Sequence, residues 1–285
     1  MLAPVPRRLS WTLALLALTP FWAVAEPRLP VFDVHIHYSQ AAWQQYPPQT
    51  VVEVWNQAGI ERAIVSSTPD DGTVLLYEAA PQRVVPFLRP YRGQWNSGNW
   101  YEDPGLMAYL QERLKLGIHK GIGEFHMFNP AGVDTSGVRA VVKLAVERNL
   151  YLYIHSGAEA AGRLAALDPQ AKVLWAHAGM SEPPDVVAAV LAKYPNVWTE
   201  TSFRAGDISG GSGIDPAWKA LLMKYRDRIM VDSDTYVTSR LANCGELIDE
   251  HRRWLSQLPP DVAEQLAWRN AARLFGTGGR VALEK

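Results

Sequence analysis

Short hydrophobic runs alternate with longer stretches of helical period from residue 31 to the end of the chain. Between the short runs, apolar residues recur every three to four positions, as expected for helices packed on one face. Such patterns lie at 104–116, 135–149, 184–194 and 216–226, and a last one runs from Asp261 to a stop at Gly276. The short runs, rich in β-branched and aromatic residues, predict eight strands, at 31–37, 61–67, 84–90, 120–126, 150–155, 172–177, 196–202 and 228–233.

Strands separated by helices imply parallel pairing with right-handed crossovers. Eight strand–helix units in this length suit one closed (βα)8 barrel better than an open sheet. No repeat, low-complexity tract or domain boundary interrupts the pattern. We therefore predict an α/β protein with a single TIM-barrel domain over residues 26–285.

The first 25 residues form a separate segment with the features of a secretory signal peptide. Arg7 and Arg8 precede a mostly apolar stretch, and Ala23-Val24-Ala25 provides small residues for cleavage before Glu26. Pro20 interrupts the apolar stretch, which is also short for a membrane span. The mature protein is therefore expected in the periplasm or outside the cell. The sequence leaves open whether export uses the twin-arginine route.

Charge and cysteine content exclude several classes of function. Loss of Arg7 and Arg8 from 28 basic residues leaves 26 against 29 acidic ones, with no long run of charge. We expect no nucleic-acid partner and no membrane association after cleavage, and the oligomeric state, including a homo-oligomer, stays open. The single cysteine, Cys244, cannot form an intramolecular disulfide, and we expect it to pack on a helix.

Histidines and carboxylates stand where the predicted strands end. His35 and His37 lie two residues apart, so their side chains project from the same face of the first strand. Parallel barrel strands present their carboxyl ends at one mouth, where such folds keep their chemistry. The residues expected to converge there as metal ligands are His35, His37, Glu124, His155, His177 and Asp234.

Imidazole and carboxylate ligands without thiolates suit Zn²⁺, with Mn²⁺ or Fe²⁺ as alternatives. One or two such ions would lower the pKa of water and yield a nucleophile near neutral pH. Asp234 is then the expected proton acceptor. His177 either polarises the substrate carbonyl or completes a second metal site, and His126 is a competing ligand on the same face as Glu124.

These motifs together resemble the amidohydrolase superfamily, and most closely its amidohydrolase family 2 branch. The resemblance covers essentially the whole mature chain and rests on Asp33-x-His35-x-His37, Gly123-Glu124, His155, Ala176-His177-Ala178-Gly179, the segment Arg228 to Asp234 and the tail Val262 to Gly276. It implies a distorted TIM barrel with one or two divalent metals. Most members hydrolyse a C–O or C–N bond, and a minority decarboxylate aromatic or unsaturated acids.

Two positions depart from the pattern of the family. Asp232 stands where Gly usually precedes Ser233, and no carboxylated lysine is expected on the fourth strand, because Lys120 lies at its beginning. Glu124 takes that place, as in the deoxyribonuclease-like relatives. We expect Asp33 to orient a histidine from beneath the metal site, and His119 and His251 to face solvent.

Substrate-binding candidates lie on the loops after the strands. Arg89 could hold a carboxylate or phosphate, and Arg204 follows the seventh strand, although ordinary ion pairs explain both equally well. Trp95, with Trp100 and Tyr101, could form a lid or simply pack its loop on the barrel. His126 is a further candidate, and Glu200 could bind substrate or form a buried salt bridge.

The sequence favours a metal-dependent hydrolase of a small ester, lactone or amide. The first alternative is a metal-dependent, non-oxidative decarboxylase of a small carboxylic acid on the same barrel, for which Arg89 would hold the leaving carboxylate. The second alternative is an exported barrel that binds a ligand or metal without catalysis. The presence of Asp234 argues against the second alternative, because a dead enzyme would have no need of its general base.

Overall fold

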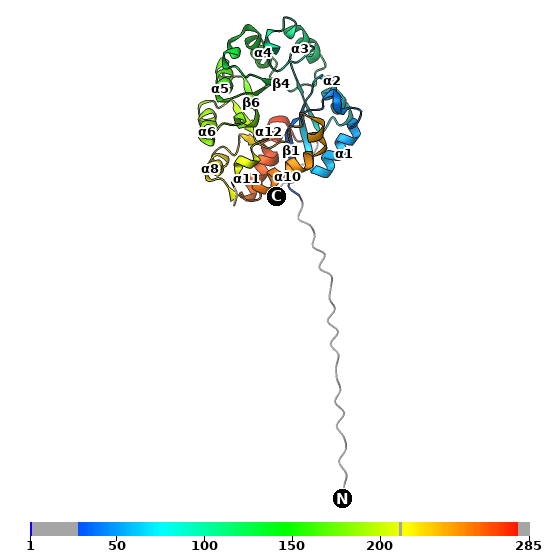
Figure 1. Cartoon of the computed structure of the whole chain (residues 1–285), viewed down its shortest axis with the longest axis vertical. Coiled ribbons are helices and arrows are strands. Elements are labelled where there is room, and N and C mark those ends of the chain that lie inside the picture. The colour runs from blue at the N-terminus through cyan, green and yellow to red at the C-terminus, as the bar shows by residue number, and fades with distance from the viewer. Residues whose placement is uncertain (2–27, 211–212, 279–285) are drawn as a thin grey trace.

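A computed structural model describes Met1 and residues 28–210 and 213–278 of the chain, so the predicted signal peptide lies almost wholly outside the described residues. Eight parallel strands pair in chain order, and helices surround them (Figure 1). The Val34 amide donates to the Val231 carbonyl at 3.4 Å and links the first strand to the end of the last. The predicted single (βα)8 barrel is therefore confirmed.

Each of the eight predicted strands overlaps an observed one. The barrel strands are β1 (Val31–Ile36), β2 (Ile60–Ser66), β3 (Val84–Leu88), β4 (Gly121–His126), β5 (Tyr151–His155), β6 (Lys172–Trp175), β7 (Val197–Glu200) and β10 (Ile229–Met230). A two-stranded ribbon, β8 (Ser209–Gly210) and β9 (Gly213–Ile214), follows β7. The sequence pattern did not predict this ribbon.

The helices cover the outside of the barrel and close its lower end. They are α1 (Pro48–Ala58), α2 (Asp71–Ala79), α3 (Leu106–Leu114), α4 (Ser136–Glu147), α5 (Ala158–Leu167), α6 (Pro184–Lys193), α7 (Ala205–Ile208), α8 (Pro216–Lys224), α9 (Thr238–Ala242), α10 (Cys244–Leu255), α11 (Pro260–Glu264) and α12 (Asn270–Phe275). Single turns of 3-10 helix occur at η1 (Gln40–Ala42), η2 (Trp100–Glu102), η3 (Pro130–Asp134) and η4 (Ala176–Gly179). A π-helical turn, η5 (Gln265–Arg269), joins α11 to α12.

Local sequence signals explain where the outer helices begin. The Thr135 side chain caps α4 by accepting from the Val138 amide. Asp215 caps α8 in the same way, and Pro216 occupies the first helical position, where its missing N–H costs nothing. Each helix then turns its apolar face toward the strands; α4, for example, buries Val138 and Val141.

Two hydrophobic cores lie on the two sides of the strands. The outer core fills the space between strands and helices, and includes Cys244, which is fully buried on α10 as predicted. The inner core fills the barrel and is closed from below by the C-terminal segment. Phe275 packs its ring 4.7 Å from Tyr151 and 5.9 Å from Phe87. The lower end is therefore sealed, and chemistry is confined to the other mouth.

Two histidines expected on the surface are buried, so those expectations were wrong. His119 is 5 % exposed, and its Nε2 lies 3.1 Å from Asp70 Oδ1. His251 is 3 % exposed and packs its ring against Trp254. The charged neighbours of His251 in the sequence suggested a solvated helix face. In the structure His251 instead lies on the buried face of α10, together with Ile248 and Trp254. The described residues include no helix long and apolar enough to span a membrane.

We expect His251 to make the protein acid-sensitive. Burial lowers the pKa of His251 to about 4, so the neutral imidazole stabilises the fold above the unfolded pKa near 6.5, and this contribution is lost as the pH falls toward 4. Relative to His251→Gln, the wild type should lose about 2 kcal/mol of unfolding free energy between pH 7.5 and pH 5. Denaturant titrations at both pH values measure this difference. A gap between the two proteins that does not change with pH would contradict the expectation.

Candidate metal centre

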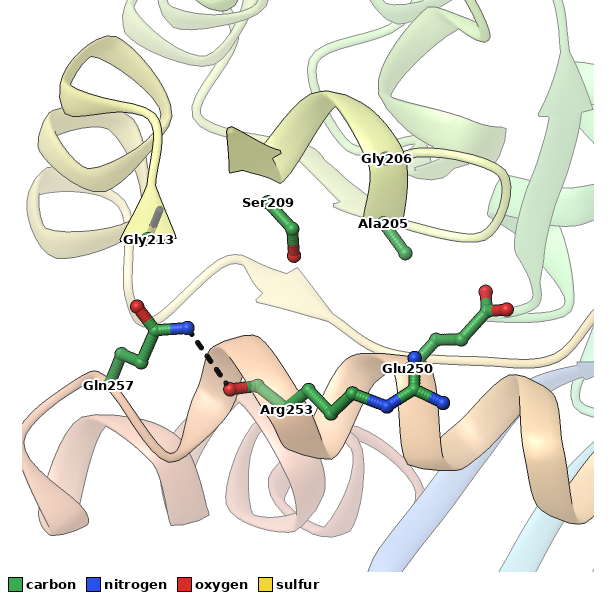
Figure 2. A pocket seen from close by; sticks show the side chains of 7 residues that line it. All are labelled: Ala205, Gly206, Ser209, Gly213, Glu250, Arg253 and Gln257. Carbon is green, nitrogen blue, oxygen red and sulfur yellow. Dashed lines mark hydrogen bonds between the residues drawn. The ribbon is translucent and has the colours of Figure 1, made fainter. Parts of the chain in front are cut away.

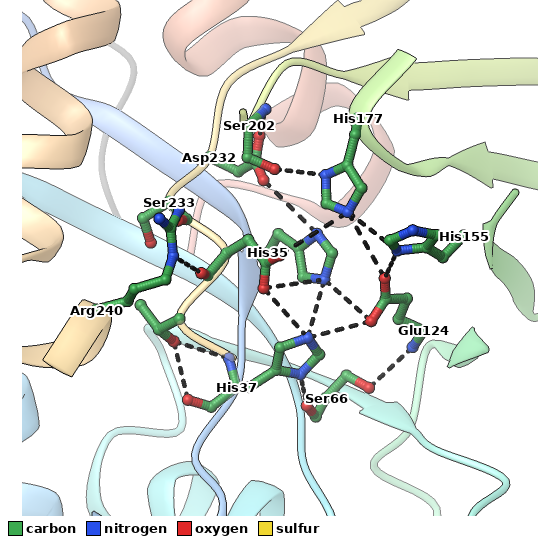
Figure 3. Close-up of polar contacts among 12 residues, drawn as sticks. His35, His37, Ser66, Glu124, His155, His177, Ser202, Asp232, Ser233 and Arg240 are labelled. Atoms are coloured by element: carbon green, nitrogen blue, oxygen red, sulfur yellow. Dashed lines mark hydrogen bonds and ion pairs between the residues drawn. The ribbon is translucent and has the colours of Figure 1, made fainter. Parts of the chain in front are cut away.

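All six predicted ligand residues converge at the mouth formed by the carboxyl ends of the strands. Figure 3 labels all of them except Asp234. The six residues come from five different strands or the loops that follow them, which is the arrangement that parallel strands in a ring impose. Their exposed fractions are small, at most 5 % for all except His155, which is partly buried. The ligand set is His35, His37, Glu124, His155, His177 and Asp234.

Two carboxylates divide the cluster into two adjoining groups. Glu124 Oε2 lies 3.2 Å from His37 Nε2 and 3.5 Å from His35 Nε2, whereas its other oxygen lies 2.8 Å from His155 Nδ1 and 3.8 Å from His177 Nε2. Asp234 repeats the division, with Oδ1 at 3.5 Å from His37 Nε2 and Oδ2 at 3.8 Å from His177 Nε2. Each carboxylate therefore offers one oxygen to the His35–His37 pair and the other to the His155–His177 pair.

The separations match the coordination shell of a metal ion. Donor atoms bound tetrahedrally to one zinc at about 2.0–2.2 Å lie roughly 3.3–3.6 Å apart. The Nε2 atoms of His35 and His37 face each other at 3.0 Å. His37 Nδ1 contacts the Ser66 carbonyl and therefore carries the proton, which leaves a lone pair on Nε2. A neutral His35 that donates from Nδ1 to Glu200 presents a second lone pair at Nε2, and a cation between the two Nε2 atoms would suit both rings. Asp234 Oδ1 is a buried oxygen with no hydrogen-bond partner among the described residues. These observations fit a divalent metal.

Electrostatics also favour a positive charge at this point. Burial works against a charged His35, yet the carboxylates of Asp234 and Glu124 raise its pKa well above the usual value. Burial likewise opposes ionisation of Glu124, but the neighbouring histidines, His35 foremost, hold its pKa well below the usual range. Several carboxylates are thus enclosed together, which is stable only when cations compensate them.

Glu200, at the end of β7, orients one histidine of each group. Its Oε1 lies 3.2 Å from His35 Nδ1 and 3.1 Å from His177 Nδ1, and it also accepts from the Tyr153 hydroxyl at 3.1 Å. Its Oε2 accepts from the Ser202 amide. The buried pairing expected as one alternative for Glu200 is the one that the structure contains. Both rings therefore direct Nε2 toward the centre.

Two other aspartates lie beneath the ligands. Asp33 accepts from the backbone amides of His35 and Ser233 and from the Ser233 hydroxyl at 2.6 Å. It therefore joins the first strand to the last and contacts the backbone of His35 rather than its ring, and burial raises its pKa to about 7. Asp232 Oδ2 lies 3.6 Å from His35 Nδ1, and burial together with Glu200 raises the pKa of Asp232 well above its usual value.

Three residues with left-handed backbone conformation follow the barrel strands β6, β7 and β10. His177, Phe203 and Asp234 have φ values of 57°, 62° and 42°, a conformation that costs energy for residues other than glycine. Arg240 holds the loop that carries Asp234 by donating to the carbonyls of Ser233 and Asp234, each at 2.7 Å. The unusual backbone turns these side chains to the mouth of the barrel.

Arg89 and His126, two of the predicted substrate-binding residues, border the cluster. Arg89 donates to Glu124 Oε2 at 2.7 Å and to the Glu124 carbonyl at 3.1 Å. His126 stacks on His155 with ring centroids 4.3 Å apart, and its Nδ1 lies 2.7 Å from the Tyr91 hydroxyl. Burial lowers the pKa of His126 to about 3. Both are near enough to meet a substrate, and their roles stay predictions.

The other two candidates, Trp95 and Arg204, are placed differently. The structure shows no side-chain contact of Trp95 with the cluster among the residues it describes; its backbone pairs with Arg92. Trp100, from the same loop, is buried and donates to the His126 carbonyl, so this ring packs the loop on the barrel. Arg204 is 2 % exposed and donates to the carbonyls of His177, Ala178 and Glu182. These bonds favour a structural role for Arg204 over substrate binding.

A separate pocket of about 570 Å³ lies between α7, the β8–β9 ribbon and α10 (Figure 2). Its lining includes Glu250 and Arg253, but none of the six ligand residues. It lies apart from the metal-ligand cluster, so we place the chemistry at the cluster and not here.

Some residues that shape the centre were missed by the sequence analysis. Tyr153 could have been identified, because it lies two residues before His155 and so shares its face of the strand. Ser66 contacts His37 through its backbone carbonyl and Ser202 contacts His177 through its hydroxyl, but serines at strand ends are too common to be recognised. Arg240 acts through backbone carbonyls, which leave no signal in a sequence.

Removing the carboxylate of Glu200 should weaken metal binding. Glu200→Gln keeps the size of the side chain but removes its negative charge, and its NH2 group must face either the two imidazoles or the Ser202 amide, which is a donor. We therefore expect roughly 10–100-fold lower zinc affinity. Competition with a fluorescent chelator measures this. Glu246→Gln, an exposed position on α10, is the matched control. Equal zinc affinity in the Glu200 variant and the wild type would show that the two histidines need no such support.

Several solved structures share the fold of this chain. A putative 2-pyrone-4,6-dicarboxylic acid hydrolase from Pseudomonas putida is 16 % identical, with a TM-score of 0.62 over 88 % of this chain and 99 % of that one. An amidohydrolase from Burkholderia multivorans with bound zinc is 17 % identical, with a TM-score of 0.58 over 86 % and 99 %. A 5-carboxyvanillate decarboxylase from Sphingomonas paucimobilis is 14 % identical, with a TM-score of 0.57 over 87 % and 99 %.

At these identities the solved structures establish the shared fold alone, and no curated protein matches the chain. The family model is more specific. Residues 90–277, which carry Glu124, His155, His177 and Asp234, match the model described as amidohydrolase. Taken with the barrel and the converging ligands, this match shows that the chain belongs to the amidohydrolase family of enzymes.

Proposed function

We propose that this protein is a metal-dependent hydrolase of a small ester, lactone or amide. The observation that carries the proposal is the division of Glu124 and Asp234 between two histidine pairs, since each carboxylate offers one oxygen to each pair. The two histidine pairs, with the carboxylates they share, would hold one or two cations, and such cations would activate water. Zinc is the metal we propose, because imidazole and carboxylate are its usual ligands, with Mn²⁺ or Fe²⁺ as alternatives.

When bound, the cation supplies Lewis acidity to a water molecule and to the substrate carbonyl. The protein supplies the proton transfers. Asp234 accepts the proton of the attacking water as the new C–O bond forms, and returns it to the leaving oxygen or nitrogen as the scissile bond breaks. Glu200 keeps the Nε2 atoms of His35 and His177 directed at the centre, and Arg89 fixes Glu124 through its carboxylate and its carbonyl.

Decarboxylation is the second candidate, since a relative of the same fold is named as a decarboxylase. The test is to supply the mature chain with two equivalents of zinc and to measure two products. Acid release is followed on a panel of lactones, esters and amides, and carbon dioxide release on aromatic acids. We expect acid release that zinc restores after chelation. Carbon dioxide as the sole product would replace hydrolysis with decarboxylation, and neither product would favour a binding protein.

We further propose that the protein is exported and acts in the periplasm or outside the cell, on account of the leader at residues 1–25. Its partner is then a small molecule, with no nucleic acid and no membrane involved. Fractionation of cells that produce the full chain, with detection of a product shortened by about 25 residues, tests this.

A further inference from the structure

A pocket of about 170 Å³ lies beside the metal-ligand cluster, between the loop after β1 and the loop after β10. His37 and Thr235 line it, so it adjoins the cluster directly. Ala42 and Leu241 contribute buried apolar walls, and Val237 and Tyr236 contribute exposed ones at its edge. The volume is close to that of a cavity of about 150 Å³ that binds benzene. It can therefore receive one six-membered ring or a branched alkyl group.

The lining of this pocket carries hydroxyl groups and the neutral imidazole of His37, but no charged side chain. Of the four hydroxyl residues, Thr235 already has partners inside the protein, since its Oγ1 accepts from the His37 amide and donates to the His37 carbonyl, both at 2.9 Å. A carboxylate placed here would be removed from water without a cation to compensate it, which costs several kcal/mol.

The arginines on the loops around the mouth are also engaged with partners inside the protein. Arg89 pairs with Glu124, and Arg92 pairs with Asp103 through two bonds of 2.7 Å. Arg204 and Arg240 donate to backbone carbonyls. No lysine or arginine of the described residues lines this pocket. A substrate with a negatively charged distal group would therefore find no lysine or arginine in this pocket to pair with.

We infer that the pocket binds an uncharged, apolar group of the substrate, such as a phenyl ring or a branched alkyl chain, while the reacting carbonyl faces the ligand cluster. This inference rests on the proposed function and adds the substrate class. It sets this chain apart from a relative named for a dicarboxylic acid. Ala41, Ala42 and Val237 are then the residues that determine specificity.

The test uses hydroxamic acids, which bind zinc through one end and present the other to the pocket. Calorimetry on the zinc-loaded protein compares acetohydroxamic, benzohydroxamic and 4-carboxybenzohydroxamic acid. We expect benzohydroxamic acid to bind at least about tenfold more tightly than its carboxylated analogue, because the charge is not compensated in the pocket. Hydrolysis of phenyl-substituted and carboxyphenyl-substituted butyrolactones is compared in parallel.

Exposed positions supply the variants, so folding is not at risk. Ala41→Phe fills the pocket and should weaken benzohydroxamic acid by about tenfold while leaving acetohydroxamic acid unchanged, since the small ligand does not reach the pocket. Gln40→Phe, on the same short helix but outside the lining, is the matched control. Val237→Arg should reverse the preference in favour of the carboxylated ligand by supplying the missing cation.

Equal or tighter binding of the carboxylated ligand to the wild type, no effect of Ala41→Phe, or no binding of either aromatic ligand would each overturn the inference. Failure of the proposed function gives a different result. In that case no lactone is hydrolysed although the hydroxamic acids still show the expected preference. The binding data thus test the apolar pocket, and the turnover data test the proposed hydrolase activity.

Discussion

The Asp234→Asn variant should lose turnover by a factor of about 10²–10⁴, the usual contribution of a general acid–base group. Asn cannot accept the proton of water, yet it has the size of Asp and tolerates left-handed backbone, which Asp234 adopts with a φ of 42°. The loop and its bonds to Arg240 should therefore persist. Steady-state kinetics on a lactone that the wild type hydrolyses provides the measurement, with circular dichroism to check the fold.

Asp234 is both a proposed metal ligand and the proposed general base. Measuring the zinc content of the Asp234→Asn variant distinguishes these two roles. If the variant retains zinc but not turnover, the loss belongs to proton transfer. Asp227→Asn, an exposed position before β10, should behave as wild type. Wild-type turnover in Asp234→Asn would remove this residue from the mechanism altogether.

Replacing both His35 and His37 with Ala should remove the metal. The wild type, purified without chelator, is expected to contain one or two equivalents of zinc per chain, and the variant close to none, because half of the donor nitrogens at the centre are gone. Activity should fall to the background rate. Elemental analysis measures the metal, and two equivalents in the wild type would favour the bridged hydrolytic arrangement over a single-metal centre.

His119→Gln is the control for this pair. It also removes an imidazole, but one that pairs with Asp70 away from the centre, so zinc should be retained. A double variant that still holds zinc after dialysis would mean that the metal is bound elsewhere. A wild type that stays metal-free after reconstitution would remove the basis of the enzymatic proposal.

The strands and the convergence of histidines at their carboxyl ends were predictable because both depend on local sequence. A β-branched run followed by a histidine places the imidazole at the carboxyl end of a strand. Parallel pairing then brings these carboxyl ends, and with them the imidazoles, to the same mouth of the barrel. The positions of His119 and His251 were not predictable, since burial there depends on packing between distant segments. Glu200 was ambiguous for the same reason: only the closed barrel brings it between His35 and His177.

The pairing of the first strand with the last has a consequence for how the protein acquires its structure. Asp33 bonds to Ser233, 200 residues away, and α12 seals the barrel from the very end of the described chain. Loop closure over such a separation is slow, because its entropic cost precedes the contacts that compensate it. A growing or truncated chain therefore lacks a working centre until almost all of it has emerged. The ligand residues near the two ends of the sequence come together only in a late step of folding, once the segment that carries Ser233 and Asp234 has joined the first strand.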